Sequence, residues 1–148
     1  MGTISFGTVL EDMQPDLSLI SNIADNETLT GAGVDMLGYQ GVVFFASALK
    51  GEIKTYGLKA QQDTDVAFGT AQDLAGSNVA FATGTSTDGF AFLEIHNPTE
   101  RYVRPMLVVP NVTTPNAVCV TALRYGKNWR PETNADGEFH EAPAEGTA

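Results

Sequence analysis

Short apolar segments, separated by turn-forming residues, are spaced regularly along the middle of the chain. Residues 39–48 form a nearly continuous apolar run with β-branched and aromatic members, which is typical of a strand buried on both faces. Residues 52–61 alternate between polar and apolar positions, with Tyr56, Leu58 and Ala60 on one face, and this pattern predicts a half-buried strand. The middle of the chain is therefore predicted to consist of strands.

Further segments have the same character, and no helical apolar period lies between them. These segments are residues 79–82, 90–96, 101–109 and 117–125. Pro105 lies inside one of them, and because proline lacks the backbone N–H, it predicts an edge position or a bulge. Short strands at regular spacing predict an all-β fold, an antiparallel β-sandwich that is jelly-roll-like.

The chain divides into three regions by composition. Residues 38–126 contain the predicted strands and form the expected β-sandwich body. Residues 1–37 have short apolar patches interrupted by Pro15 and by glycines, which fits an extended N-terminal leader or arm as well as short strands. Residues 127–148 are rich in Pro, Gly, Ala, Thr and acidic residues. Because such a segment cannot form a core of its own, an extended acidic C-terminal tail is expected.

The net charge of the chain limits the kinds of partner that can be expected. The 148 residues include 18 acidic and 8 basic ones, a formal net charge of −10. Such a surface repels nucleic acid and anionic lipid, since binding to phosphate depends on clustered Lys and Arg. No window of the sequence reaches the roughly 18 uninterrupted apolar residues of a membrane span, and the single cysteine, Cys119, excludes an internal disulfide. Neither a nucleic acid nor a membrane is therefore expected as a partner.

Two groups of side chains could support chemistry, but their spacing favours structural roles. Glu94 and His96 share one face of a predicted strand, as a metal-binding or acid–base pair would, yet no third ligand stands at a recognisable spacing. Asp63, Asp65 and Asp73 could offer oxygens to a cation, but aspartates in such loops more often bond to backbone N–H groups of their own turn. The sequence has no nucleophile elbow and no Gly-rich phosphate loop. We therefore expect no enzyme, cofactor or metal site, with a cation at the aspartates as the alternative.

Basic and aromatic residues gather at two places in this acidic chain. The first group is Arg101, Tyr102 and Arg104. The second group, taken together with one aromatic residue of the tail, is Arg124, Tyr125, Lys127, Trp129, Arg130 and Phe139. Arg, Tyr and Trp are enriched at the positions that dominate the binding energy of protein interfaces, so we predict a protein interface here. The alternative is that Arg101 and Arg104 cover a strand edge while Trp129 closes one end of the sandwich.

One stretch of the chain resembles a family of virion proteins. It covers residues 58–109, and its most specific part is Pro98 to Arg104, Pro-Thr-Glu-Arg-Tyr-Val-Arg. This stretch is similar to small β-sandwich head proteins, the cement or decoration proteins of tailed bacteriophages, which are encoded beside the major capsid protein. The resemblance implies a jelly-roll-like sandwich that stabilises the head lattice as a dimer or trimer.

These observations together predict a virion structural protein, a capsid decoration or cement protein of a tailed phage. Its expected partners are the major capsid protein and copies of itself. Its expected location is the capsid surface, after synthesis in the host cytoplasm. The leader or the tail would attach by adding a strand to the edge of a neighbouring sheet. The alternatives are a head–tail connector or tail component, and a ligand- or carbohydrate-binding β-sandwich module.

Overall fold

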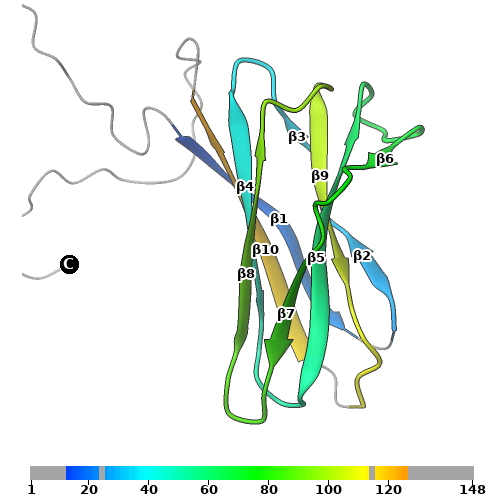
Figure 1. Ribbon diagram of the computed structural model, residues 1–148, viewed down its shortest axis with the longest axis vertical. Coiled ribbons are helices and arrows are strands. Elements are labelled where there is room, and N and C mark those ends of the chain that lie inside the picture. The colour runs from blue at the N-terminus through cyan, green and yellow to red at the C-terminus, as the bar shows by residue number, and fades with distance from the viewer. Residues whose placement is uncertain (1–12, 24–25, 114–115, 127–148) are drawn as a thin grey trace, which may run out of the picture.

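The structure, a computed structural model, describes residues 13–23, 26–113 and 116–126. These residues form two antiparallel sheets that pack face to face as a β-sandwich (Figure 1). The predicted all-β sandwich is therefore confirmed. Within these ranges the chain forms no helix, and so none that is long and apolar enough to cross a membrane.

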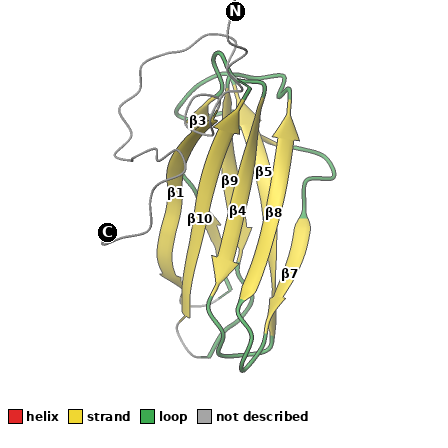
Figure 2. Cartoon of the chain, turned by 90° about the vertical axis from the view of Figure 1, so that its left-hand side faces the viewer, coloured by secondary structure: helices red, strands yellow, loops and turns green. Residues whose placement is uncertain are grey.

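Each sheet is built from strands that are far apart in the sequence. Sheet A contains, in spatial order, β1 (Met13–Ile23), β10 (Asn116–Tyr125), β4 (Gly41–Ala48) and β8 (Gly89–His96), as Figure 2 shows. At the centre of sheet B, β9 (Tyr102–Val108) lies beside β5 (Lys54–Asp63). Shorter strands extend sheet B, namely β2 (Thr28–Thr30) and β3 (Val34–Asp35) on β9, and β6 (Gln72–Asp73) and β7 (Val79–Thr83) on β5.

Alternate side chains of the long strands point inward and fill the space between the sheets. The largest fully buried ones include Tyr56, Phe44, Leu58, Leu107, Val42 and Val103. Tyr56, Leu58 and Ala60 are each at most 2% exposed, which confirms the face predicted for residues 52–61. Burying one such large side chain contributes about 1.5–3 kcal/mol. The core therefore supplies the main driving force that holds the two sheets together.

The described part of residues 1–37 belongs to the sandwich. β1 pairs with β10 along its whole length, and β2 and β3 pair with β9. The register of β1 shifts between Leu17 and Leu19, which marks a β-bulge. Residues 1–12 and 127–148, which include the start of the predicted leader and the predicted tail, lie outside the described residues.

Pro105 lies in an inner strand and not at a sheet edge. Its strand β9 has β5 on one side and β2 and β3 on the other. The carbonyl oxygen of Pro105 accepts a hydrogen bond from the N–H of Gly31 at 2.9 Å. Within a strand, the N and the C=O of one residue face the same neighbour, so the missing N–H of Pro105 faces the interruption between β2 and β3. The predicted edge position is wrong, whereas its alternative, a bulge, agrees with the pairing, because the three residues between β2 and β3 lie opposite only Arg104 and Pro105.

Strand β4 is covered on one face only. Phe44 and Ala46 are buried, whereas Val43 and Phe45 on the opposite face are partly exposed and Ser47 is exposed. The prediction of burial on both faces is therefore wrong for the described chain, because sheet B covers only the inner face of sheet A. The outer face of sheet A presents apolar side chains to its surroundings.

Candidate interaction surface

The two predicted groups of basic residues meet at Asp35, at the end of the sandwich where β3 ends and β9 begins. Arg101 donates to both carboxylate oxygens of Asp35, from Nε at 2.9 Å and from Nη2 at 2.7 Å. Arg124 donates from Nη1 to the backbone carbonyl of Asp35 at 2.7 Å, and from Nε to Oδ2 of Asp16 at 2.9 Å. We call these four residues, Asp16, Asp35, Arg101 and Arg124, the Asp35 cluster.

The backbone around Asp35 holds its carboxylate in place. The N–H of Leu37 donates to Oδ1 of Asp35 at 2.9 Å, which closes a turn of the kind that Asp favours. The N–H of Met36 donates to the carbonyl of Arg101 at 2.8 Å. The hydrogen bond from Arg101 holds the pKa of Asp35 below its ordinary value of 3.8, and the same contact raises the pKa of Arg101. Both groups therefore stay charged throughout the neutral pH range.

Arg124 stabilises the end of the sandwich. Its side chain is 15% exposed, and its guanidinium carbon lies 4.5 Å from the ring centroid of Tyr39. Together with the hydrogen bonds to Asp16 and Asp35, this contact joins β10 to β1, to β3 and to the turn before β4. Arg101 differs, because its side chain is 48% exposed and remains accessible to a partner.

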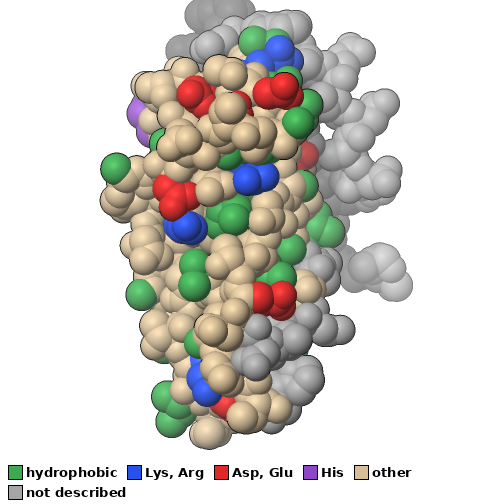
Figure 3. Space-filling model, turned by 90° about the vertical axis from the view of Figure 1, so that its right-hand side faces the viewer, with side chains coloured by type: hydrophobic (Ala, Val, Ile, Leu, Met, Phe, Trp, Pro, Cys, Tyr) green, Lys and Arg blue, Asp and Glu red, His purple; other side chains and the backbone are tan. Residues whose placement is uncertain are grey.

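Arg104 and Tyr102 lie on the outer face of sheet B, the side that Figure 3 shows. Arg104 donates to Oε1 of Gln61 from Nε at 3.0 Å and from Nη2 at 2.8 Å. Its guanidinium carbon lies 4.4 Å from the ring centroid of Phe68. The ring of Tyr102 lies under the guanidinium of Arg101 at 5.1 Å. The first predicted group therefore runs from the Asp35 cluster onto the face of sheet B.

Tyr125 faces away from sheet B, on the outer face of sheet A. Its hydroxyl donates to Oε1 of Glu94 and lies 3.0 Å from Nδ1 of His96, whose ring stacks on the tyrosine ring. Burial, followed by the hydrogen bond to Glu94, raises the pKa of Tyr125 to about 12. A Cβ at Gly41 on the neighbouring strand would lie 2.4 Å from the Tyr125 ring, so only glycine leaves room for it. Glu94 and His96 on β8 therefore hold the side chain of Tyr125 on β10 across the intervening strand β4, in keeping with the structural role predicted for them.

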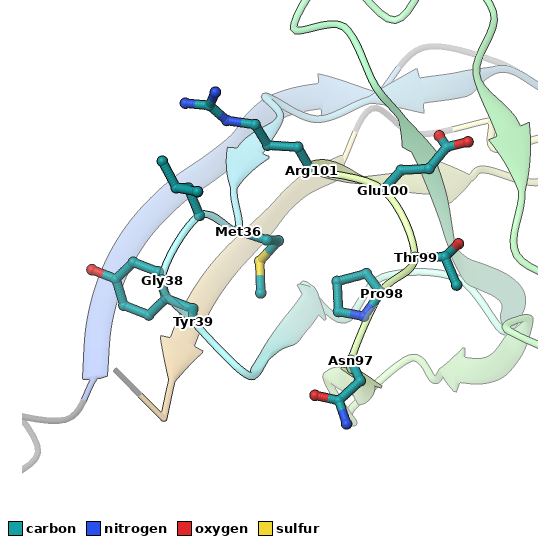
Figure 4. A pocket seen from close by; sticks show the side chains of 9 residues that line it. Met36, Gly38, Tyr39, Asn97, Pro98, Thr99, Glu100 and Arg101 are labelled. Carbon is teal, nitrogen blue, oxygen red and sulfur yellow. The ribbon is translucent and has the colours of Figure 1, made fainter. Parts of the chain in front are cut away.

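A hollow of about 360 Å³ opens beside Arg101, and Figure 4 shows its lining. Two turns form it, the one between β3 and β4 and the one between β8 and β9. The lining residues are Met36, Leu37, Gly38, Tyr39, Asn97, Pro98, Thr99, Glu100 and Arg101. Its volume falls in the range of about 300–1,000 Å³ that is usual for ligand pockets, so the hollow can receive a side chain of a partner or a small ligand.

Asp63 at the end of β5 and Asp73 in β6 accept hydrogen bonds from groups close to them in the fold. Asp63 is buried and accepts hydrogen bonds from the N–H of Asp65 at 3.0 Å and of Thr70 at 2.8 Å. The hydrogen bond from Asp65, with those from Thr70, lowers the pKa of Asp63. Asp73 accepts from Nζ of Lys59 at 2.7 Å. In the part of the chain that the structure describes, no group of three His, Cys, Asp or Glu side chains could hold a metal ion.

The structure brings together only part of the predicted interface. Arg101 and Arg124 converge on Asp35, whereas Tyr125 points to the outer face of sheet A. Four of the predicted residues lie outside the described residues, namely Lys127, Trp129, Arg130 and Phe139. Sequence reasoning missed Asp35 and Asp16, because Asp35 is 66 positions from Arg101 and Asp16 is 108 positions from Arg124. No local motif connects residues that far apart.

The fold of the chain has a counterpart among solved structures, whereas its sequence matches no family model. No protein-family model and no curated protein matches the sequence. Among solved structures, the crystal structure of the PBSX exported protein XepA is similar, with a TM-score of 0.60 and 14% sequence identity. The alignment covers 97% of this chain and 47% of that one, so the chain spans about half the length of the protein it matches. At this identity the similarity shows a shared β-sandwich fold.

Proposed function

We propose that the chain is a phage-associated structural protein and, more specifically, a capsid decoration protein that stabilises the head lattice of a tailed phage. The observation that carries the proposal is the similarity in fold to XepA over 97% of the chain, since XepA is a protein of the prophage-like PBSX. The sequence resemblance of residues 98–104 to decoration proteins supports it independently. The proposed partners are the major capsid protein and copies of the chain itself.

The Asp35 cluster supports binding through a protein surface. The guanidinium of Arg101 is about half exposed, yet two hydrogen bonds to Asp35 hold it in one orientation. A partner would meet a group that is already ordered, so less side-chain entropy is lost on binding. Tyr102 lies against Arg101 and adds an aromatic surface, and both residue types are common where binding energy concentrates.

The virion role is tested in a lysate of cells that express the chain during growth of a tailed phage. Heads, tails and soluble proteins are separated on a density gradient before the chain is detected with an antibody. We expect the chain in the fraction of assembled heads. Recovery with tails would replace the decoration role by that of a connector or tail component. Recovery only among the soluble proteins would overturn the virion role as a whole.

A matched pair of variants tests the surface itself. Arg101→Ala removes the exposed guanidinium of the Asp35 cluster, and Lys59→Ala removes the cation of an exposed ion pair on sheet B. We expect Arg101→Ala to lower recovery with heads by about tenfold or more, and Lys59→Ala to leave it unchanged. Equal recovery of the two variants would place the binding surface elsewhere on the chain.

The hollow beside Arg101 favours one second function, that of a ligand- or carbohydrate-binding module. Its lining includes the polar side chains of Asn97, Thr99 and Glu100 and the ring of Tyr39. A few polar groups around a partly apolar hollow are the usual means of fixing a small ligand. Binding of the native chain to an array of glycans, lost in the Thr99→Ala variant, would favour this function over the capsid role.

A further inference from the structure

The outer face of sheet A carries a row of apolar side chains that nothing in the described chain covers. Leu17 on β1 pairs with Thr121 on β10, Thr121 pairs with Phe45 on β4, and Phe45 pairs with Phe92 on β8. Paired residues share a face, so these residues, with Thr121 as the one polar member, form a row across the four strands of sheet A, the sheet in front in Figure 2. Leu17 and Phe92 are each 61% exposed, and so is Phe90 beside them. Apolar patches of this kind on a soluble protein mark binding surfaces.

The same face carries little charge in an acidic protein. At the outward positions of β4, β8 and β10, all within the described residues, Glu94 is the single carboxylate. One of its oxygens accepts the hydroxyl of Tyr125. The chain as a whole has a formal charge of −10, so two copies repel one another over most of their surface. The outer face of sheet A is where a second copy meets the least repulsion.

A projecting side chain and a hollow lie side by side on this face. Phe90 projects from β8 and stacks on Phe45, with ring centroids 6.2 Å apart. A mainly apolar hollow of about 340 Å³ lies beside it. It is lined by Ser47, Ala48, Leu49, Asp88, Ala117, Val118 and Cys119. Cys119 pairs with Ser47, and Ser47 pairs with Phe90, which places the hollow and the projecting ring side by side.

We infer that the outer face of sheet A binds the same face of a second copy of the chain. A twofold axis that runs parallel to the strands, between β4 and β8, places Phe90 of each copy over the hollow of the other. The two sheets A then pack face to face, as the two sheets of one sandwich do. Because projection and hollow occur on one face, that face is complementary to itself, which favours a second copy over an unrelated partner.

The face is large enough for such a contact. Strands about 4.8 Å apart, with a rise of about 3.3 Å for each residue, give a four-stranded face of eight residues an area of about 500 Å². Two copies then bury about 1,000 Å², which is the lower limit for a specific interface. We therefore expect a dissociation constant in the micromolar range. The inference does not depend on the proposed phage role, because it involves only copies of this chain.

Sedimentation velocity of the full chain, from about 1 to about 200 micromolar, tests the inference directly. We expect the mass of one chain at the lowest concentration and of two chains at the highest. In Phe90→Glu the dissociation constant should rise by about tenfold or more, since a charge would enter the apolar hollow. The matched control is Val66→Glu, which adds the same charge at a residue that is 65% exposed in the loop after β5, and it should dimerise like the native chain. A native chain that is monomeric throughout, or a Phe90→Glu variant that dimerises like the control, overturns the inference.

Labelling of Cys119 gives a second readout that needs no substitution. Cys119 is the only cysteine in the sequence and lies half-buried on the proposed face. With excess maleimide reagent, the labelling rate should fall several-fold as the concentration of the chain rises through the dissociation constant. A rate that is slow at every concentration would mean that the chain covers its own face, and a rate that is fast at every concentration would mean that the face stays open. Both results overturn the inference.

Discussion

The outer faces of the two sheets differ in the kind of side chain that they expose to water. On sheet B, Lys59 donates to Asp73, Gln61 donates to the same carboxylate, and Arg104 donates to Gln61. This chain of polar contacts runs across β9, β5 and β6 and lets the face lie against water (Figure 3). On sheet A, the corresponding positions hold Phe45, Phe92 and other apolar side chains, whose exposure to water is unfavourable. The outer face of sheet B is thus polar within one chain, whereas the described chain leaves the apolar outer face of sheet A uncovered.

Two arginines, Arg104 on sheet B and Arg124 on sheet A, use their positive charge in different ways. Arg104 lies flat on the face of sheet B against Phe68, while Arg124 reaches from sheet A to the backbone of β3 in sheet B. The first contact covers a surface, and the second holds the two sheets in register at one end. The substitutions that follow separate these roles, beginning with the largest expected effect.

The two faces of β4 offer the strongest contrast. Phe44→Ala removes a fully buried ring from the core and should lower the free energy of unfolding by about 3–5 kcal/mol. Phe45→Ala removes a ring of the outer face and should lower it by about 1 kcal/mol or less in the monomer. Urea denaturation at low micromolar concentration measures both. Equal losses would show that the outer face of sheet A is packed within a single chain.

Removal of the link between the sheets should have the next largest effect. Arg124→Ala leaves the carbonyl of Asp35 and the carboxylate of Asp16 without their donor, and should lower the free energy of unfolding by roughly 1–3 kcal/mol. Arg104→Ala loses a cation–π contact and the hydrogen bonds to Gln61, whose amide oxygen remains open to water on this face, and should lower it by about 1 kcal/mol or less. Urea midpoints of the two variants are the measurement. The reverse order would mean that the face of sheet B, and not the end of the sandwich, carries the stability.

Alternation of side chains is enough to predict several of the long strands. Residues 117–125 were predicted as a strand from Val118, Val120 and Ala122, and these three side chains are buried along β10 (Asn116–Tyr125). Such patterns are local, because successive side chains of a strand point to opposite faces whatever the strand pairs with. Pairing is not local, so the position of Pro105 in an inner strand and the pairing of Arg101 with Asp35 could not be read from the sequence.

The apolar run at residues 39–48 shows what a hydrophobic pattern cannot predict. Its composition predicted a strand covered on both faces, and the described chain covers only one of them. A hydrophobic pattern reports which side chains require burial, but not whether the cover belongs to the same molecule. If a second copy packs on sheet A, the pattern indicated the assembled state and not the single chain.

Acid should lower the stability of the chain in part through Asp63, the last residue of β5 in sheet B. Hydrogen bonds from the N–H of Asp65 and from Thr70 hold the pKa of Asp63 below 3.8, so the stabilisation is present above that value and is lost as the pH falls through the lowered pKa. In urea titrations from about pH 5 to about pH 2, Asp63→Asn should lose less stability on acidification than the native chain does. Phe45→Ala changes no titratable group and should keep the native dependence on pH. An unchanged slope in Asp63→Asn would mean that its carboxylate does not contribute to stability in this way.

The smallest effect on stability is expected from loss of the exposed ion pair on the outer face of sheet B. Lys59 and Asp73 form an ion pair with side chains that are 27% and 51% exposed, and such pairs contribute little because water and salt screen them. Lys59→Ala should therefore leave the urea midpoint at physiological salt within the error of the measurement, and should remove only a small dependence on salt. A loss as large as that of Arg124→Ala would show that the polar contacts of sheet B act as one cooperative network. In that case sheet B would owe its stability in water to the network as a whole, and the contrast with sheet A would lie in cooperativity and not in polarity alone.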